Sequence, residues 1–299
     1  MSHAASPSTK RRYGVVMVAE EFGVRRSTYY AAQARTSSSS ATTTEKGKRG
    51  PRTQHTDAAL VERIREVLAQ SPFTGEGYRK AWARLRVRGI RTSKARVLRL
   101  MRAHGLLAPV RPRRELGPRT HEGTITTAKP DQMWGTDLTT VVTLEEGQAA
   151  VFVAVDHCTT ECVGIHAAKA ATRFEALEPI RQGVRQHFGG FEAAIATGLT
   201  LRHDNGSQYL SDHFQTEIRF LGIASSPSFV RAPEGNGCAE RFIRTLKEQL
   251  LWVQTFRTIE ELRQALLAFA RRYNTEWLVE RHGHRTPAQA RRDALAEAA

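Results

Sequence analysis

The stretch QAAVFVAVDHCT, residues 148–159, is a nearly unbroken apolar run that ends in polar residues. Strands that are apolar throughout are usually covered on both faces, so this run predicts a strand in the interior of a sheet. It is much shorter than the about 20 apolar residues that a helix needs to cross a bilayer. No other apolar run in the chain approaches that length.

Segments on both sides of this strand alternate between strand and helix patterns. Residues 131–143 predict a strand with mixed faces, and residues 162–170 predict a third strand. Beyond them we expect a helix that contains Pro179, a strand, a helix, a short strand and a long helix, at residues 172–190, 199–207, 211–222, 223–229 and 258–276. This order predicts an α/β fold with a five-stranded mixed sheet and flanking helices.

Positive charge is concentrated in the front of the chain. The 299 residues carry a formal net charge of +15. Residues 1–128 contain 26 Lys and Arg against 9 Asp and Glu, whereas residues 129–299 contain 19 against 21. The division indicates a nucleic-acid-binding front half joined to a nearly neutral back half. The three cysteines have no framework or zinc-site spacing, so we expect neither disulfides nor zinc.

The composition divides the chain into six segments. We expect a short helix-turn-helix-like segment at 1–34 with a turn at Gly23, then a disordered basic linker at 35–54. A helical domain at 55–106 precedes a Pro/Arg-rich connector at 107–128. The α/β core then occupies 129–290, and 291–299 form a C-terminal tail.

The helical domain at 55–106 has two helices with arginine-rich faces. Thr56 is a candidate N-cap for its first helix, and Thr92 or Ser93 for its third. We interpret the domain as a helix-turn-helix or winged-helix unit on DNA. A solvated basic face on a small bundle is the alternative. The side chains expected to contact DNA are Arg79, Lys80, Lys94, Arg96, Arg99 and Arg102.

Three carboxylates stand out by their positions. Asp137 falls inside a predicted strand, where Asp is depleted, and Asp204 follows another strand before an Asn-Gly turn. Taken alone, Asp204 is an ordinary turn residue and Glu240 an exposed helical residue. The segments between the three can return Glu240 to the sheet beside the aspartates. Converged carboxylates repel one another unless a cation lies between them, and oxygen ligands suit Mg²⁺ or Mn²⁺.

Three motifs at this spacing resemble a known family. They are WGTDLT (134–139), HDNGSQY (203–209) and SPSFVRAPEGNGCAERFIRTLKE (226–248), with 35 residues between the second aspartate and the glutamate. The chain resembles the DDE transposases of bacterial insertion sequences, which share a ribonuclease-H-like core with retroviral integrases. Residues 77–106 and 271–290 are similar to a subgroup whose transposase is encoded in two overlapping frames. Within that subgroup, the chain resembles the second-frame product.

The resemblance implies a catalytic and metal-binding triad of Asp137, Asp204 and Glu240 that holds two Mg²⁺ or Mn²⁺ ions. One ion would activate water or a DNA 3′-hydroxyl, and the other would stabilise the leaving 3′-oxygen. Water gives strand cleavage at the element's end, and a 3′-hydroxyl gives strand transfer.

Further residues of the site follow from helix geometry. Glu240, Arg244 and Lys247 share one helix face, and the family has a basic residue at the position of Lys247. We expect Lys247 and Arg244 to contact DNA, with an ion pair from Lys247 to a neighbouring glutamate as the alternative. His203 and Asn205, beside Asp204, are expected to orient water or phosphate. A second stripe of the helix is expected to be buried: Phe242, Leu246, Leu250 and Val253.

The resemblance also implies partners. They are the element-end and target DNA, further copies of the chain on that DNA, and an upstream first-frame product, separate or fused. We expect no membrane or small-molecule partner and a cytoplasmic, nucleoid-associated location. The zinc module of retroviral integrases is not found. One rival function is a ribonuclease-H-like nuclease that only hydrolyses, and another is a non-catalytic DNA-binding regulator of transposition.

Overall fold

The computed structural model of the chain describes residues 4–37, 54–109, 125–228 and 236–297. The chain divides into two compact units, residues 1–53 and 54–299. No helix in the described ranges is both long enough and apolar enough to cross a membrane.

The N-terminal unit contains two helices around a glycine turn. Helices α1 (Val15–Glu21) and α2 (Arg26–Ser37) are separated by Gly23, whose φ of +62° favours glycine. Their packing is slight, because Ala19 is buried but Phe22 is 60% exposed. Helix α2 also continues past the predicted segment end at residue 34. Most of the predicted linker lies outside the described residues.

The second unit begins with three helices that enclose a small core. They are α3 (Asp57–Ala69), α4 (Tyr78–Val87) and α5 (Lys94–Ala103). The predicted caps are confirmed, since the Thr56 and Ser93 side chains accept hydrogen bonds from backbone N–H groups in the first turns of α3 and α5. The core residues recur at helical spacing and include Leu60, Ile64, Val67, Leu85, Val97, Leu100 and Met101. The first part of the predicted connector, to residue 109, is described, and residues 110–124 are not.

The α/β core is built on a five-stranded mixed sheet of order β3-β2-β1-β4-β5. Its strands are β1 (Met133–Thr143), β2 (Gly147–Asp156), β3 (Cys162–Ala168), β4 (Thr200–His203) and β5 (Ala224–Pro227). Strands β1, β2 and β3 pair antiparallel, whereas β4 and β5 continue the sheet parallel to β1. The predicted strand order along the chain is confirmed, and β2 lies inside the sheet as its apolar run predicts.

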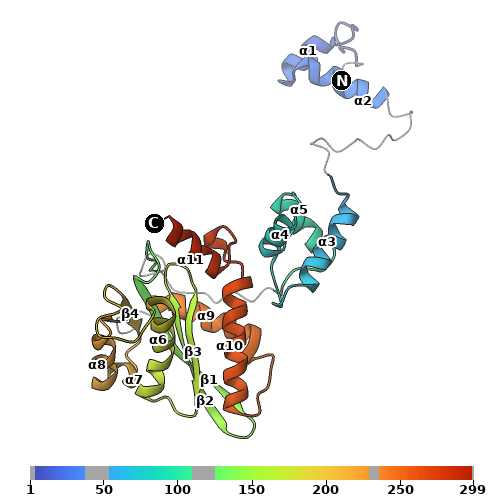
Figure 1. Ribbon diagram of the computed structural model, residues 1–299. Coiled ribbons are helices and arrows are strands. Elements are labelled where there is room, and N and C mark those ends of the chain that lie inside the picture. Colours follow the sequence, from blue (N-terminus) through green and yellow to red (C-terminus); the bar gives the residue numbers. More distant parts are fainter. Residues whose placement is uncertain (1–3, 38–53, 110–124, 229–235, 298–299) are drawn as a thin grey trace. The chain divides into compact units, whose positions relative to one another are not determined.

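Helices cover both faces of this sheet (Figure 1). Helices α6 (Arg173–Phe188), α7 (Ser207–Leu210) and α8 (Asp212–Phe220) contribute to one hydrophobic cluster, and α9 (Gly237–Leu246) and α10 (Ile259–Glu276) to another. Residues of β2 alternate between the clusters, with Val151 and Val153 in one and Phe152 and Ala154 in the other. Coverage on both faces explains why β2 is apolar throughout.

Pro179 lies within α6, which continues through it as one helix. The helix lies directly on β3 at Gly164, where a Cβ would come within 1.9 Å of the Pro179 carbonyl oxygen. Glycine at this strand position therefore allows the helix and sheet to approach closely.

Helix α9 ends earlier than its sequence pattern predicts. At Lys247 it passes into a π-helical turn, Lys247–Leu251. Phe242 and Leu246 are buried as expected, but Val253 is 65% exposed. The prediction for Val253 is wrong because it assumed that α-helical spacing continues to residue 253, whereas the π turn interrupts that spacing.

The C-terminal helix α11 (Pro287–Ala296) belongs to the core. It begins at a Thr286–Gln289 capping box and is preceded by a 3₁₀ turn at Glu280–His282. Its Arg291 is buried and binds Asp131 with an Nη1–Oδ2 distance of 2.6 Å, and it also binds Glu161. The predicted boundary between residues 290 and 291 is therefore wrong, because α11 crosses it with a buried ion pair on its far side.

Candidate active site

Two of the predicted carboxylates lie at the same edge of the sheet. In the parallel pairing of β1 and β4, Trp134 is opposite Leu201 and Gly135 is opposite Arg202. Strand β4 ends at His203, so the same register continued by two residues places Asp137 opposite Asp204. Asp204 therefore follows the carboxyl end of β4, where sites of α/β folds gather, and Asp137 lies within β1 beside it.

The start of helix α9 is fastened to the same part of β1. The Asn236 side-chain amide donates to the Thr136 carbonyl oxygen at 2.8 Å, next to Asp137. The Cys238 thiol donates to the Asp156 carbonyl oxygen of β2 at 3.6 Å. Glu240 is exposed and lies one helical turn after Asn236, hence on the face of α9 that meets β1.

The electrostatics of Asp137 show that these groups are neighbours. The pKa of Asp137 is raised to about 6, mainly by burial and partly by the negative charges of Asp204 and Glu240. A hydrogen bond from the Leu138 N–H and the Lys247 ammonium act in the opposite direction. Asp137 therefore interacts electrostatically with both other carboxylates and with Lys247.

The arrangement is not a closed metal centre. Among the residues that the structure describes, no three His, Cys, Asp or Glu side chains are grouped closely enough to hold a metal ion. The donors at this edge are nonetheless carboxylates, without thiol or imidazole, and one of them is protonated more readily because of its burial and its acidic neighbours. Such a donor set fits a hard divalent cation such as Mg²⁺ or Mn²⁺.

Gly135 allows the first strand and α9 to meet. A Cβ at this position would lie 2.5 Å from Asn236 Oδ1 and 2.8 Å from His157 Nε2. Both of these atoms are buried and have no hydrogen-bond partner in the described structure. Our sequence reasoning did not identify Gly135, Asn236 or His157 as site residues. The available signals were Gly135, two residues before Asp137, and Asn236, four residues before Glu240.

His203 and Asn205 hold the turn that carries Asp204. His203 is buried, and its ring nitrogens contact the Asp204 carbonyl oxygen at 2.7 Å and Ser225 Oγ at 2.9 Å. The Asn205 amide donates to the Ser228 carbonyl oxygen at 3.0 Å. Because both His203 nitrogens have protein partners, the structure gives this residue a positioning role. The predicted direct contact with water or phosphate is not supported for it.

The basic residues of α9 differ in exposure. Arg244 is exposed, whereas Lys247 is half-buried at the start of the π turn. Since α9 remains α-helical to Leu246, the seven-residue interval from Glu240 to Lys247 keeps both on one face. Lys247 thus lies beside the carboxylates, and its contact with DNA stays a prediction.

The predicted DNA-contacting residues of the three-helix domain are in unequal environments. Lys80 is 2.8 Å from the centre of the Trp277 ring and 3.9 Å from Glu76 Oε1, and burial lowers its pKa to about 7. Arg79 binds Glu280 at 3.0 Å. The prediction for Lys80 is wrong, because the ammonium group packs against the core. Of the others, Arg96 and Arg99 bind Asp57, and Lys94 and Arg102 are exposed.

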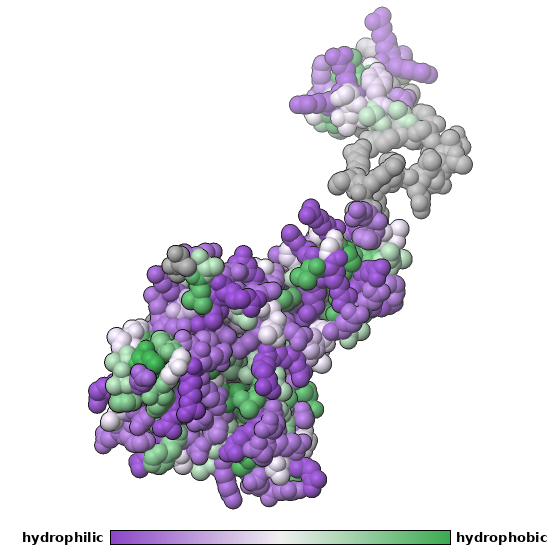
Figure 2. All heavy atoms as spheres, in the orientation of Figure 1, coloured by the Kyte–Doolittle hydropathy of each residue, from purple (hydrophilic) through white to green (hydrophobic). Residues whose placement is uncertain are grey.

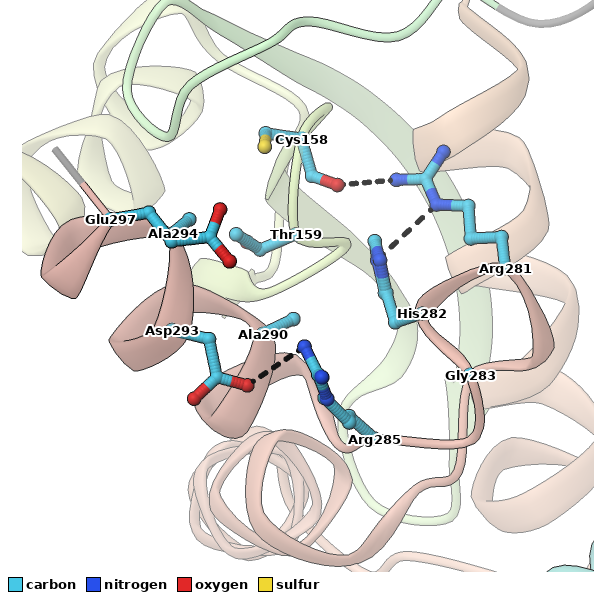
Figure 3. Close-up of a pocket in the computed structure, with 10 residues that line it drawn as sticks. All are labelled: Cys158, Thr159, Arg281, His282, Gly283, Arg285, Ala290, Asp293, Ala294 and Glu297. Atoms are coloured by element: carbon cyan, nitrogen blue, oxygen red, sulfur yellow. Dashed lines mark hydrogen bonds and ion pairs between the residues drawn. The ribbon is translucent and has the colours of Figure 1, made fainter.

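A pocket elsewhere in the core contains none of the predicted site residues. Its volume is about 390 Å³, and it lies between the turn after β2, the hairpin before α11 and α11 itself (Figure 3). Arg281 donates there to the Cys158 carbonyl oxygen at 3.0 Å, and Arg285 binds Asp293 at 3.0 Å. Its charged groups are of both signs, and two of them, Arg285 and Asp293, bind each other.

The sheet order, the two helical layers and the carboxylate edge define an integrase-type α/β core behind a helix-turn-helix-like domain. Comparison with known families agrees. An HTH-like domain matches residues 54–114, and integrase core domains match residues 127–233 and 221–287. The predicted ribonuclease-H-like core is confirmed.

Curated relatives identify the family. "Transposase InsD for insertion element IS2A/D/F/H/I/K" of Escherichia coli is 30% identical over 212 residues, which are 69% of this chain and 68% of that protein. The chain belongs to this family of insertion-element transposases. A 48.2 kDa protein of insertion element IS2A from Escherichia coli is 29% identical over 83% of this chain, but the match spans only 57% of that relative.

The comparison with solved structures found chains that are similar to part of this one. The catalytic core domain of BIV integrase is 21% identical, with a TM-score of 0.42 over 56% of this chain and 97% of that one. The simian T-cell lymphotropic virus intasome contains a chain that is 21% identical, with a TM-score of 0.45 over 70% of both chains.

Proposed function

We propose that the chain cleaves and joins DNA at the ends of an insertion sequence, with Asp137, Asp204 and Glu240 as the catalytic carboxylates. The observation that carries this proposal is their convergence. Asp137 lies within β1 and Asp204 directly follows the neighbouring parallel strand β4, and Glu240 follows the Asn236 anchor to β1 by one turn. Membership in a transposase family supports it.

The three carboxylates would hold divalent cations, Mg²⁺ or Mn²⁺, two in the proposed mechanism. Bound there, the ions supply activation of the attacking oxygen and charge stabilisation of the leaving 3′-oxygen. The protein's own part is positional. Asn236 fixes the start of α9 against β1, and the Asp204 carboxylate accepts from the Gly206 N–H at 2.9 Å, which fixes its turn. Lys247 offers a cation beside the carboxylates for a DNA phosphate.

We further propose element-end and target DNA as substrates and several copies of the chain in the active complex. An upstream first-frame product, separate or fused, is proposed as an additional partner. The match to only part of the 48.2 kDa relative is compatible with a longer fused form. The basic front half, with 26 Lys and Arg against 9 acidic residues, favours this reading over a nuclease that only hydrolyses.

The direct test compares Glu240→Gln with Glu276→Gln in an assay of Mg²⁺-dependent cleavage and joining of element-end DNA. Glu276 is exposed at the end of α10 and serves as a matched control. We expect Glu240→Gln to abolish both reactions while DNA binding persists, and Glu276→Gln to behave as the unmodified chain. Cleavage by Glu240→Gln at the normal rate would reject the triad. Cleavage without joining by the unmodified chain would favour the hydrolytic rival, and DNA binding without either reaction would favour the regulator.

A further inference from the structure

Most basic side chains in the three-helix domain already have an acidic partner. Within the described residues 54–109, two carboxylates, one from α3 and one from the loop before α4, account for four of them. Glu76 binds Arg84 and Lys80, and Asp57 binds Arg96 and Arg99. Exposed pairs on α3 and at the junction with the core complete the set: Arg63–Glu66, Arg65–Glu62 and Arg79–Glu280.

Five cations of the described residues 54–109 have no acidic partner, and four of them lie around the turn between α4 and α5: Arg86, Arg88, Arg91 and Lys94, whereas Arg102 lies in the last turn of α5. Arg88 donates to the Gln70 side-chain oxygen. Arg86 lies in the last turn of α4, Arg91 in the connection, and Lys94 is the first residue of α5. All three are exposed. We call them, together with Trp82, the turn face. Figure 2 shows mainly hydrophilic residues on the visible side of this domain.

Trp82 organises the turn face. Its indole N–H donates to the Thr92 carbonyl oxygen at 2.8 Å, which fixes the ring against the connection. The Arg86 guanidinium lies 5.0 Å from the ring centre, and the Lys94 ammonium 4.5 Å from it. An aromatic ring holds a cation without neutralising it, so both side chains keep their charge for an external anion.

The other side of α5 is already neutralised. Arg96 donates from Nε and Nη2 to Asp57 Oδ1 at 2.9 and 2.7 Å, and Arg99 donates to Oδ2 at 2.7 Å. These contacts hold the pKa of Asp57 at about 2, so it stays charged at neutral pH. A DNA phosphate would have to displace this carboxylate to reach either guanidinium.

We propose that the turn face, rather than the arginines paired with Asp57, is the surface on which this domain docks duplex DNA. The inference rests on the proposed function and names the surface that serves it. Three uncompensated cations around the N-terminus of α5, a ten-residue helix, suit the phosphates that flank a groove. In helix-turn-helix proteins that end of the recognition helix meets DNA. Arg86 and Arg91, which the sequence did not single out, therefore join Lys94.

The test measures duplex binding by the full chain at several salt concentrations. We expect Arg86→Gln/Arg91→Gln/Lys94→Gln to reduce the slope of log K against log salt by about 3, since each lost phosphate contact reduces it by about 1. Arg63→Gln/Arg65→Gln is the matched control on exposed, paired arginines and is expected to leave the slope unchanged. Circular dichroism and thermal unfolding verify that each variant is folded.

A second variant tests the role of Asp57 in the opposite direction. Asp57→Asn frees Arg96 and Arg99, so we expect tighter binding and a slope increased by about 1 to 2. The inference is overturned if the triple variant keeps the original slope, if the α3 control loses as much, or if single-stranded DNA or RNA is bound in preference to duplex. Failure of the unmodified chain to bind any element-end DNA would instead reject the proposed function.

Discussion

Charged side chains are arranged in opposite ways in the three-helix domain and at the carboxylate edge, the part of the sheet that carries Asp137 and Asp204. In the former, acidic side chains bind most of the arginines, as Asp57 binds Arg96 and Arg99. At the edge of the sheet, like charges face one another and burial raises the pKa of Asp137 to about 6. Paired charges in this chain hold elements together, and uncompensated ones mark surfaces that need an external partner. This holds both for the carboxylates at the edge of the sheet and for the basic residues of the turn face.

The largest effect should come from breaking the buried pair that holds α11. Arg291→Met leaves Asp131 and Glu161 without their guanidinium partner, so we expect a loss of about 3–5 kcal/mol in unfolding free energy. Arg285→Met breaks the exposed pair with Asp293 and should cost less than about 1 kcal/mol. Urea unfolding of both variants measures the contrast. Equal losses of unfolding free energy in the two variants would show that the buried ion pair contributes no more to stability than the exposed one.

A smaller effect is expected at the contact between β1 and α9. Gly135→Ala places a methyl group against Asn236 and His157, which overpacks the site and should cost about 1–3 kcal/mol. Because the strain falls between Asp137 and Glu240, DNA cleavage should decline far more than stability does. Gly147→Ala, at a turn with open space but a φ of +76°, controls for backbone strain alone. Normal cleavage by folded Gly135→Ala protein would contradict this account of the contact.

The raised pKa of Asp137, which is caused mainly by burial, predicts a pH dependence of stability. The folded-state pKa of Asp137 is about 6 and its ordinary value is 3.8, so the folded state retains the proton that the unfolded state loses. Stability from this group is present below about pH 4 and is lost as the pH rises to about 6, by at most about 1.4 kcal/mol per pH unit. Asp137→Asn should remove that slope in metal-free buffer. An unchanged slope in the variant would assign the titration to another group.

The smallest effect on stability is expected at Asn236. Asn236→Ala removes one hydrogen bond to the Thr136 carbonyl oxygen, which should cost about 1 kcal/mol. Its effect on DNA joining should be larger, because the bond orients the helix that carries Glu240. Comparing joining rates with unfolding free energies separates the two roles. A loss of joining no greater than the loss of folded protein would make Asn236 merely structural.

Much of this organisation could be predicted from the sequence because it follows local periodicity. The apolar run of β2, the caps at Thr56 and Ser93 and the order of strands all depend on neighbouring residues. The end of α9 at Lys247 could not be predicted, since a π turn changes the phase without a compositional signal. The burial of Lys80 and Arg291 also depends on partners distant in the chain.

The residues of the candidate site likewise include some that local sequence patterns predict and others that depend on distant contacts. The position of Asp137 inside a strand and that of Asp204 after one could be predicted, and the sheet register brings the two together. The roles of Gly135 and Asn236 depend on a contact between residues about a hundred positions apart, which no local pattern contains. Sequence composition likewise shows how many arginines there are but not which of them a carboxylate already holds.

The most direct test of the central claim is the binding of Mn²⁺, followed by electron paramagnetic resonance, to the full chain and to Asp137→Asn, Asp204→Asn and Glu240→Gln. If the three carboxylates form one divalent-cation site, each substitution weakens Mn²⁺ binding, and Glu276→Gln leaves it unchanged. Mn²⁺ binding by all three variants with the affinity of the unmodified chain would contradict the account.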